Sequence, residues 1–314
     1  MRHIFIVNPR SGHQDATPVI QKALSELNPS EPYEIYVTSA PGDATQYVRT
    51  RCQADTSPLR FYACGGDGTL NEVVSGAAGF PGAAVTVFSG GSGNDFVKLF
   101  DDPGAFFSLE RLLDAEEATF DLIRCNDDLA LNICSEGLDA RIGTDVANYK
   151  RIPLLQGFRA YAVSTLVNVI RGIAEHYVVE INGETIDGEL TFVCVCSGRF
   201  YGGGFNPVPE ADPADGILDV LLVKKVSRLQ VPAVIGKYKS GRYKELTGLI
   251  RHFRTDHVTI RCDRDTPINL DGELRRGRVV HMSVAKEKLR FFYPKGLTWQ
   301  AEGQPVKEGS HDTH

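Results

Sequence analysis

The sequence of 314 residues has no long hydrophobic segment. A membrane-spanning helix needs about 18 or more consecutive apolar residues. The longest candidate, residues 160–170, is interrupted by Ser164, Thr165 and Asn168. Near the N-terminus the apolar run covers only residues 4–7, which is too short for a signal peptide. We therefore expect a cytoplasmic protein without a transmembrane segment.

An excess of positive charge is also lacking, because the net charge is −6 and the pI is about 5.8. Proteins that bind nucleic acid usually present a basic face, so we expect no nucleic-acid partner. The seven cysteines form no C-x-x-C pair. Cys194 and Cys196 lie two residues apart in a strand-like segment, where small buried side chains are favoured over metal ligands. This cysteine usage indicates a reducing compartment.

Short apolar runs alternate with helical patterns over residues 1–122. The expected strands are residues 4–7, 33–38, 60–64 and 83–88, and the expected helices are residues 17–27, 43–52 and 69–76. Asp43 is expected to cap the second helix. This order predicts an α/β N-terminal domain with a doubly wound parallel sheet. Ligands of such sheets bind beyond the carboxyl ends of the strands, where glycines stand here.

Strand-like runs dominate residues 123–289, interrupted by one long helical pattern at residues 154–173. This part is expected to form a second domain, a mostly antiparallel β-sandwich that carries the acceptor substrate. We expect residues 290–300 to rejoin the first domain. The polar tail, residues 301–314, is expected to be disordered.

The strongest local signal is Cys-Gly-Gly-Asp-Gly-Thr-Leu-Asn-Glu at residues 64–72, between an expected strand and an expected helix. Glycines let the backbone approach a polyanion, and a helix N-terminus suits phosphate. It is neither a Walker A loop nor a G-x-G-x-x-G dinucleotide motif. A carboxylate such as Asp67 would repel a phosphate unless a divalent cation lies between them.

Gly-Gly-Asp-Gly-Thr at residues 65–69 resembles a signature shared by diacylglycerol, sphingosine and NAD kinases and, more distantly, phosphofructokinases. Three further stretches resemble the lipid-kinase branch: Asn-Pro-Arg-Ser-Gly at 8–12, Gly-Ser-Gly-Asn-Asp-Phe at 91–96, and Asp-Gly-Glu at 271–273. The second glycine loop departs from the family pattern, because it begins Phe-Ser-Gly-Gly where Pro-Leu-Gly is usual. Ser92 replaces the usual Thr but keeps the hydroxyl.

The resemblance implies a kinase that uses ATP as phosphoryl donor and Mg²⁺ as cofactor. Asp67, Asp95 and Asp121 match the acids that organise the catalytic Mg²⁺, partly through water. For Asp121 an exposed acid at a strand edge is the alternative. Asp271 matches the general base, with Glu273 nearby to orient it or the nucleotide, although Asp-Gly is also a common hairpin turn. A second Asp-Gly-Glu, at residues 187–189, is expected to be only a hairpin turn.

The resemblance also implies a nucleotide site. Its expected residues are Asn8, Arg10, Ser11, Gly12, Thr38, Gly65, Gly66, Asp67, Gly68, Thr69, Leu70, Asn71, Ser92 and Asn94. For Thr38, an ordinary hydroxyl at a strand end is the alternative. Asp212, Asp215 and Ile217 resemble a loop that holds a structural Mg²⁺ in some members, whereas the local pattern also fits a type I turn at residues 215–216.

Three functions remain open. The first is a lipid kinase that phosphorylates a hydroxyl on a diacylglycerol-like lipid at a membrane surface, with a role in phospholipid biosynthesis. The second is a kinase of a soluble nucleotide, like NAD kinase. The third is a non-catalytic lipid or nucleotide sensor. An exposed edge strand of the second domain could pair two copies into a homodimer.

Overall fold

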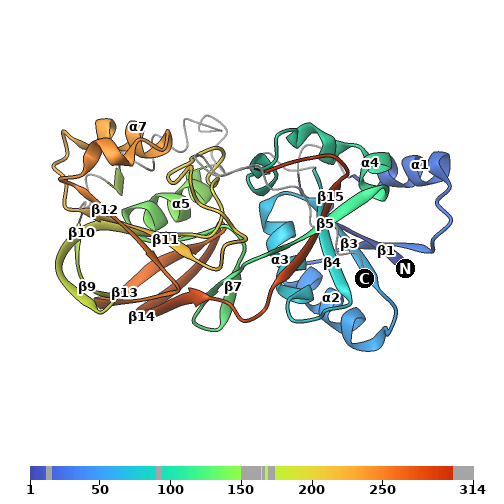
Figure 1. Ribbon diagram of the computed structural model, residues 1–314, viewed down its shortest axis with the longest axis horizontal. Coiled ribbons are helices and arrows are strands. Elements are labelled where there is room, and N and C mark those ends of the chain that lie inside the picture. The colour runs from blue at the N-terminus through green and yellow to red at the C-terminus, as the bar shows by residue number, and fades with distance from the viewer. Residues whose placement is uncertain (12–15, 90–93, 150–163, 165–166, 169–173, 300–314) are drawn as a thin grey trace. The chain divides into compact units, whose positions relative to one another are not determined.

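The computed structural model describes residues 1–11, 16–89, 94–149, 164, 167–168 and 174–299. Two compact units make up the chain (Figure 1): one contains Met1–Leu122 and the chain from Lys286 onward, and the other contains Ile123–Ala285. Most of the expected helix at 154–173 and the whole expected disordered tail at 301–314 lie outside the described residues. No helix in the described ranges has the length and apolar character needed to cross a membrane.

The first unit is built on a six-stranded sheet with the order β2-β1-β3-β4-β15-β5. The strands are β1 (Arg2–Val7), β2 (Tyr33–Val37), β3 (Leu59–Gly65), β4 (Ala83–Ser89), β5 (Ala115–Phe120) and β15 (Leu289–Pro294). Strands β1 to β4 pair in parallel, β15 joins β4 in parallel, and β5 pairs antiparallel with β15. The predicted doubly wound α/β architecture is confirmed.

Helices cover both faces of this sheet, with α1 and α4 on one side and α2 and α3 on the other (Figure 1). Their bounds are α1 (Thr17–Leu27), α2 (Asp43–Ala54), α3 (Asp67–Ala77) and α4 (Leu109–Leu113), and two 3₁₀ turns are η1 (Phe96–Leu99) and η2 (Pro103–Phe107). The expected capping role of Asp43 is wrong, because Gly42 is the N-cap and makes no side-chain cap. The Asp43 carboxylate instead accepts hydrogen bonds from Ser39 and Tyr36.

The core of the first unit includes a cluster of aromatic rings around β15. Phe291 is fully buried, and its ring centroid lies 5.0 Å from that of Phe96, 5.9 Å from that of Phe120 and 6.1 Å from that of Phe100. Each such ring buries a large apolar area, and edge-on pairs add about 0.5–1.5 kcal/mol beyond that area. These contacts anchor the C-terminal strand in the first unit.

The described residues of the second unit form nine antiparallel strands, β12-β11-β10-β8-β13-β14-β6-β7 in order, with β9 pairing both β10 and β13. Their bounds are β6 (Ile123–Cys125), β7 (Asp128–Ala130), β8 (Ile133–Gly137), β9 (Glu175–Ile181), β10 (Glu184–Cys196), β11 (Leu218–Lys224), β12 (Ile250–Thr255), β13 (His257–Leu270) and β14 (Glu273–Val284). The helices among its described residues are α5 (Leu138–Tyr149) and α7 (Val231–Lys239), with a 3₁₀ turn η3 (Tyr243–Leu246).

The expected turn at residues 187–189 is wrong. Asp187 lies inside β10, opposite Val178 of β9, and the turn of this hairpin is formed by Asn182 and Gly183. Both turn residues have positive φ, 50° and 75°. A two-residue hairpin loop favours Asn-Gly because its geometry requires positive φ at both positions, which decides the turn against the later Asp-Gly.

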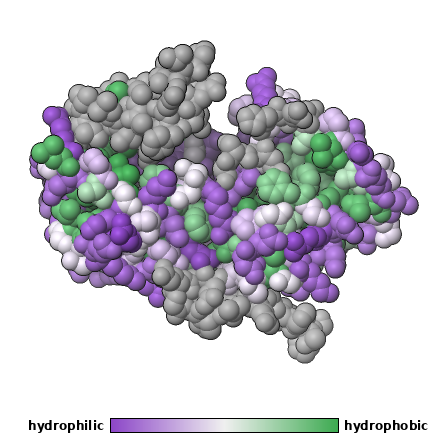
Figure 2. All heavy atoms as spheres, turned by 90° about the horizontal axis from the view of Figure 1, so that it is seen from above, coloured by the Kyte–Doolittle hydropathy of each residue, from purple (hydrophilic) through white to green (hydrophobic). Residues whose placement is uncertain are grey.

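Polar residues prevail on the face of the molecule seen in Figure 2, with apolar residues in scattered patches. Among the described residues Leu229 is the most exposed large apolar side chain, at 94% of its surface. Single exposed apolar side chains are normal on soluble domains. The residues with a chemical role therefore have to be sought at strand ends and loops.

Candidate functional site

The glycine loop joins β3 to α3 without an intervening segment. Gly65 is the last residue of β3, Gly66 is the N-cap, and α3 begins at Asp67. A Cβ atom on Gly65 would lie 2.3 Å from the Thr69 hydroxyl oxygen, so only glycine fits there. The free N–H groups of the first helical turn thus lie directly at the strand end, where phosphate binds well.

The loop that follows β1 is tied to this glycine loop. The Asn8 backbone N–H donates to the Cys64 carbonyl at 3.1 Å, and its side-chain amide donates to the Thr69 hydroxyl at 3.2 Å. The Asn8 side-chain oxygen accepts from the Arg10 N–H at 3.0 Å. The two predicted loops therefore form one surface, and Asn8 is its link. Gly12 and Ser92 of the predicted nucleotide site lie outside the described residues.

Two other residues border the same strand ends. Thr38 follows β2, and both its N–H and its hydroxyl donate to the Val7 carbonyl, at 2.9 and 3.3 Å. The Thr38 hydroxyl thus binds the last residue of β1 in this structure. Glu72 of α3, which the motif analysis did not single out, accepts from the Gly42 N–H at 2.9 Å. It fixes the loop before α2 against the glycine-loop helix.

Asp67 and Asp95 meet although they follow different strands. The Asp67 Oδ1 atom accepts from the backbone N–H of Asp95 at 2.7 Å. Burial and the neighbouring charge of Asp95 raise the pKa of the Asp67 carboxyl. Asn94, just before Asp95, has φ of 47°, a left-handed conformation that asparagine tolerates. The structure thus brings together two of the three acids predicted to organise Mg²⁺.

Asp95 and Asp121 are both buried, and each has a lysine partner that the motif analysis did not single out. Lys98 pairs with Asp95 from three residues further along the chain, and Lys288 pairs with Asp121. At 4% exposure Asp121 is not the exposed strand-edge acid of the alternative reading. Rings beside these acids also touch, since the Phe96 and Phe120 centroids are 5.6 Å apart.

The donor chemistry of these acids suits a hard cation. Buried carboxylates that repel each other gain from a divalent ion, and Mg²⁺ prefers oxygen ligands and retains several waters. Within the described ranges, no group of three His, Cys, Asp or Glu side chains is close enough to hold a metal by itself. Asp67 and Asp95 could contribute carboxylate oxygens to an ion whose other ligands are water and phosphate oxygens.

In the second unit, Asp271 and Gly272 form the two-residue turn between β13 and β14, with Leu270 opposite Glu273. Their φ values of 48° and 97° match a turn that needs positive φ twice. The Glu273 side chain is about half exposed and lies 3.9 Å from the Arg275 guanidinium. The hairpin reading of Asp-Gly is therefore correct.

The Asp271 carboxylate is held by backbone N–H groups of one segment. Leu131 donates to Oδ2 at 2.5 Å, Ile133 donates to Oδ1 at 2.8 Å, and Asn132 lies 3.1 Å from both oxygens. The Asp271 N–H donates in return to the Ile133 carbonyl at 3.1 Å. An ionised carboxylate offers about four lone-pair sites, and these donors fix its orientation.

The predicted structural-metal loop contains a different arrangement of charges. The Asp215 carboxylate accepts from the Ile217 N–H at 3.0 Å and pairs with the Arg254 guanidinium. The Asp212 side chain accepts from the Ala214 N–H at 3.1 Å. The turn corner lies at residues 213–214, because the Asp215 N–H donates to the Asp212 carbonyl at 3.3 Å. Arg254 supplies the positive charge beside Asp215 in this structure.

Comparisons with known proteins agree with this architecture. The family profile of the diacylglycerol kinase catalytic domain matches residues 2–125, and that of the YegS C-terminal NAD kinase beta sandwich-like domain matches residues 132–293. A Staphylococcus carnosus protein named "Putative lipid kinase" is 28% identical over 74% of this chain and 76% of its own length.

Solved structures show the same fold. A crystal structure titled as a diacylglycerol kinase from Bacillus anthracis covers 94% of this chain and 97% of its own, with a TM-score of 0.68 and 19% identity. A second Bacillus anthracis structure, titled as a "putative diacylglycerol kinase", has a TM-score of 0.74 and 21% identity over 94% of this chain and 98% of its own. At these identities the likeness concerns the fold.

Proposed function

Because the chain belongs to the family of diacylglycerol kinase-like phosphotransferases that join these two domains, we propose that it transfers the γ-phosphoryl group of ATP to the hydroxyl of a diacylglycerol-like lipid. The observation that carries the proposal is the contact of Asp67 with the Asp95 backbone directly beside the glycine loop. Half-buried Asp67 and buried Asp95, next to the proposed phosphate-binding loop, fit a metal-dependent kinase better than a passive sensor.

The donor nucleotide is assigned to the surface formed by the two joined loops. The N–H groups at the start of α3 face the triphosphate, and Asn8 holds the loop after β1 against Thr69. Asn8, Arg10, Ser11, Thr38, Gly65 to Asn71 and Asn94 remain the proposed contacts, together with Gly12 and Ser92. Lys98 and Lys288 neutralise Asp95 and Asp121 until the nucleotide and its metal arrive.

Bound Mg²⁺ would bridge phosphate oxygens and offset the charge that develops during transfer. Asp67 and Asp95 would hold the ion, with Asp121 acting through water. Phosphoryl transfer needs little covalent chemistry from the protein, so the positioning of these acids is their main contribution. The raised pKa of Asp67 supports this assignment, because a carboxylate whose ionised form is disfavoured by its surroundings is stabilised by a nearby cation.

Asp271 is proposed as the general base for the lipid hydroxyl. Its carboxylate is oriented by the backbone N–H groups of residues 131–133. The acceptor hydroxyl would donate there and lose its proton as its oxygen attacks the γ-phosphorus. Glu273, at the other side of the turn, would orient Asp271 or the nucleotide.

The test is transfer of radiolabelled γ-phosphate to a panel of acceptors. Vesicles containing diacylglycerol, sphingosine or phosphatidylglycerol are compared with NAD in solution, each with Mg²⁺ or with EDTA. We expect labelling of a lipid that requires Mg²⁺. Labelling of NAD alone would reject the lipid acceptor, and absence of transfer to every acceptor would favour a non-catalytic sensor.

A further inference from the structure

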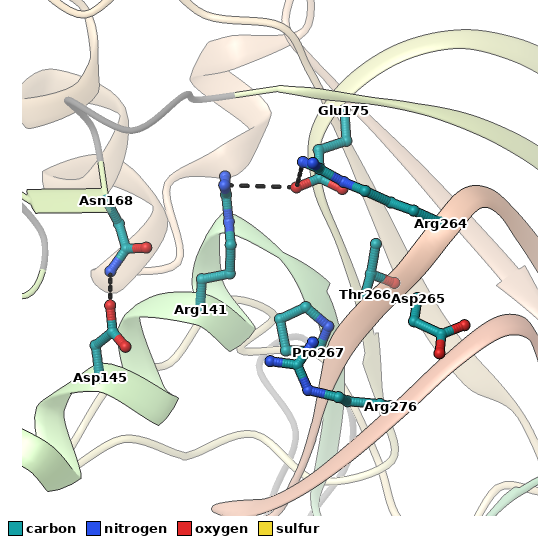
Figure 3. A pocket seen from close by; sticks show the side chains of 9 residues that line it. All are labelled: Arg141, Asp145, Asn168, Glu175, Arg264, Asp265, Thr266, Pro267 and Arg276. Carbon is teal, nitrogen blue, oxygen red and sulfur yellow. Dashed lines mark hydrogen bonds and ion pairs between the residues drawn. The ribbon is translucent and has the colours of Figure 1, made fainter.

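The second unit contains a polar cavity of about 300 Å³ between α5 and the β13–β14 hairpin (Figure 3). Three arginines from three different elements line it: Arg141 from α5, Arg264 from β13 and Arg276 from β14. None of them belongs to the motifs that carry the proposed phosphoryl transfer. Arginine carries a planar fork of N–H donors that matches the oxygens of phosphate and carboxylate.

One glutamate holds two of these guanidinium groups in place. Glu175, at the start of β9, accepts from Arg264 at 3.0 Å and lies 3.4 Å from Arg141. Its side chain is 11% exposed and that of Arg141 is 17% exposed, so their charges are only partly screened by water. One negative charge shared between two positive charges leaves the group of three residues with an excess of +1.

Arg276 adds a second positive charge at the rim of the cavity. Its guanidinium points toward Pro267 and the cavity in Figure 3, and it forms no hydrogen bond or ion pair with any other residue in the described part of the chain. Asp145 and Asp265 also line the cavity, so the formal charges of its lining balance, and the Arg276 fork, unpaired among the described residues, is the group that favours an anion. Asp145 accepts from the Asn168 amide at 2.9 Å.

We propose that this cavity binds a phosphate group, carried either by the headgroup of an anionic phospholipid or by a free phosphate. Arg276 and Arg264 would bind its oxygens from the hairpin side, and Arg141 from the helix side. The volume is at the lower end of that of small-molecule sites, which suits a headgroup rather than a whole lipid. The inference does not depend on the acceptor of the proposed kinase reaction.

The place of Arg276 on the hairpin gives phosphate binding a structural consequence. It lies on β14, the strand that follows the turn of Asp271. Strands rise about 3.3 Å per residue, so five residues place it roughly 17 Å along the chain from that turn. A phosphate bound between Arg141 and Arg276 would hold α5 and this hairpin together. Phosphate binding should therefore protect the amides of β14 from hydrogen exchange.

Direct binding provides the test. Titration calorimetry of the full chain with inorganic phosphate, at constant ionic strength, is compared with flotation on phosphatidylcholine vesicles with and without phosphatidylglycerol. The variant is Arg276→Gln, and the matched control is Arg278→Gln, an exposed arginine on the same strand outside the cavity lining. We expect Arg276→Gln to weaken binding at least about tenfold, since the variant removes the charge-assisted hydrogen bonds of the guanidinium group.

Each outcome either supports or overturns the proposed phosphate site. Binding of inorganic phosphate that depends on Arg276 but not on Arg278 supports a site for free phosphate. Vesicle binding that requires phosphatidylglycerol and Arg276, without phosphate binding, supports a headgroup site. Equal losses in both variants, or binding that neither variant weakens, would overturn the proposal. Arg276→Lys keeps the charge without the fork and should bind with intermediate affinity, and circular dichroism checks that every variant is folded.

Discussion

The backbone N–H of Asp95 donates to the Asp67 carboxylate at 2.7 Å, which holds two acids from different loops within one hydrogen bond of each other. Burial and the second negative charge both oppose ionisation of Asp67, and the Lys98 ammonium beside Asp95 offsets them only in part. The protein tolerates a local cost in stability at this point. That cost makes the role of Asp67 measurable by two independent properties, activity and stability.

Replacing Asp67 by Asn should abolish transfer and stabilise the fold. Asparagine keeps an oxygen that can accept the Asp95 N–H but removes the charge, so we expect activity to fall at least about 100-fold. The folded pKa of Asp67 is raised, so its contribution to stability is complete below the unfolded value of about 3.9 and is lost as pH rises through the folded value. At neutral pH, Asp67→Asn should therefore melt higher than the wild type.

Magnesium together with ATP should reverse the order of the two melting temperatures, so that the wild type melts higher than Asp67→Asn. We expect MgCl₂ together with ATP to raise the melting temperature of the wild type and to have a much smaller effect on Asp67→Asn, with EDTA removing the difference. Asp127→Asn, which changes an exposed acid outside the site, is the control. An equal magnesium response in all three proteins would show that Asp67 does not hold the ion.

Gly65 offers a steric test of the phosphate loop. Because an added Cβ would meet the Thr69 side chain at 2.3 Å, Gly65→Ala should destabilise the first unit by about 1–3 kcal/mol and weaken ATP binding. Gly82→Ala is the matched control, since nothing lies within 4 Å of its added Cβ. Its stability should stay the same or rise by up to about 1 kcal/mol. Urea unfolding and nucleotide titration measure both effects, and equal ATP affinity of the two variants would remove the loop from the nucleotide site.

Local patterns were enough to predict the main elements of the first unit. Helix α1 has the predicted bounds because Pro18 fits its first turn and Asn28 ends it in a left-handed conformation. Helix α3 starts two residues earlier than predicted. The prediction began the helix after Gly68 because glycine is unfavourable inside a helix on propensity alone, but Gly68 lies in the first turn. The glycine loop is therefore shorter, and the helix N-terminus closer to the strand, than the motif suggested.

Contacts between distant segments could not be predicted in the same way. Lys288 reaches Asp121 across 167 positions of the sequence, and Glu175 joins arginines from α5 and β13. Neither pair has a spacing that a single sequence reveals, because sheet pairing brings them together. The meeting of Asp67 with Asp95 was implied by family resemblance, and the structure adds the hydrogen bond that holds them.

Substitutions in the loop around Asp215 can distinguish a structural metal site from a simple ion pair. Arg254 pairs with Asp215 and lies 3.7 Å from Asp219, so we expect Arg254→Ala to destabilise the second unit, and addition of MgCl₂ to compensate part of the loss. Asp215→Asn in the same background should remove that magnesium response, as followed by differential scanning calorimetry. If Asp215→Asn in the otherwise wild-type chain lost a magnesium stabilisation that Asp67→Asn retained, the structural metal would be present beside Arg254.

Asp271 can serve as a base, as an anchor for residues 131–133, or as both, and Asp271→Asn distinguishes these roles. The asparagine side chain has one oxygen and one NH₂ group, and the NH₂ group would face a backbone N–H that needs an acceptor. That backbone N–H loses its partner, which should lower the stability by about 1–3 kcal/mol. If Asp271 is the base, turnover should also fall about 10²–10⁴-fold at a temperature where the variant is folded, and the acid limb of the pH–kcat profile should disappear. Glu273→Gln, beside the same turn, keeps the anchor and should keep the acid limb. A folded Asp271→Asn enzyme with most of its turnover would leave Asp271 as an anchor only.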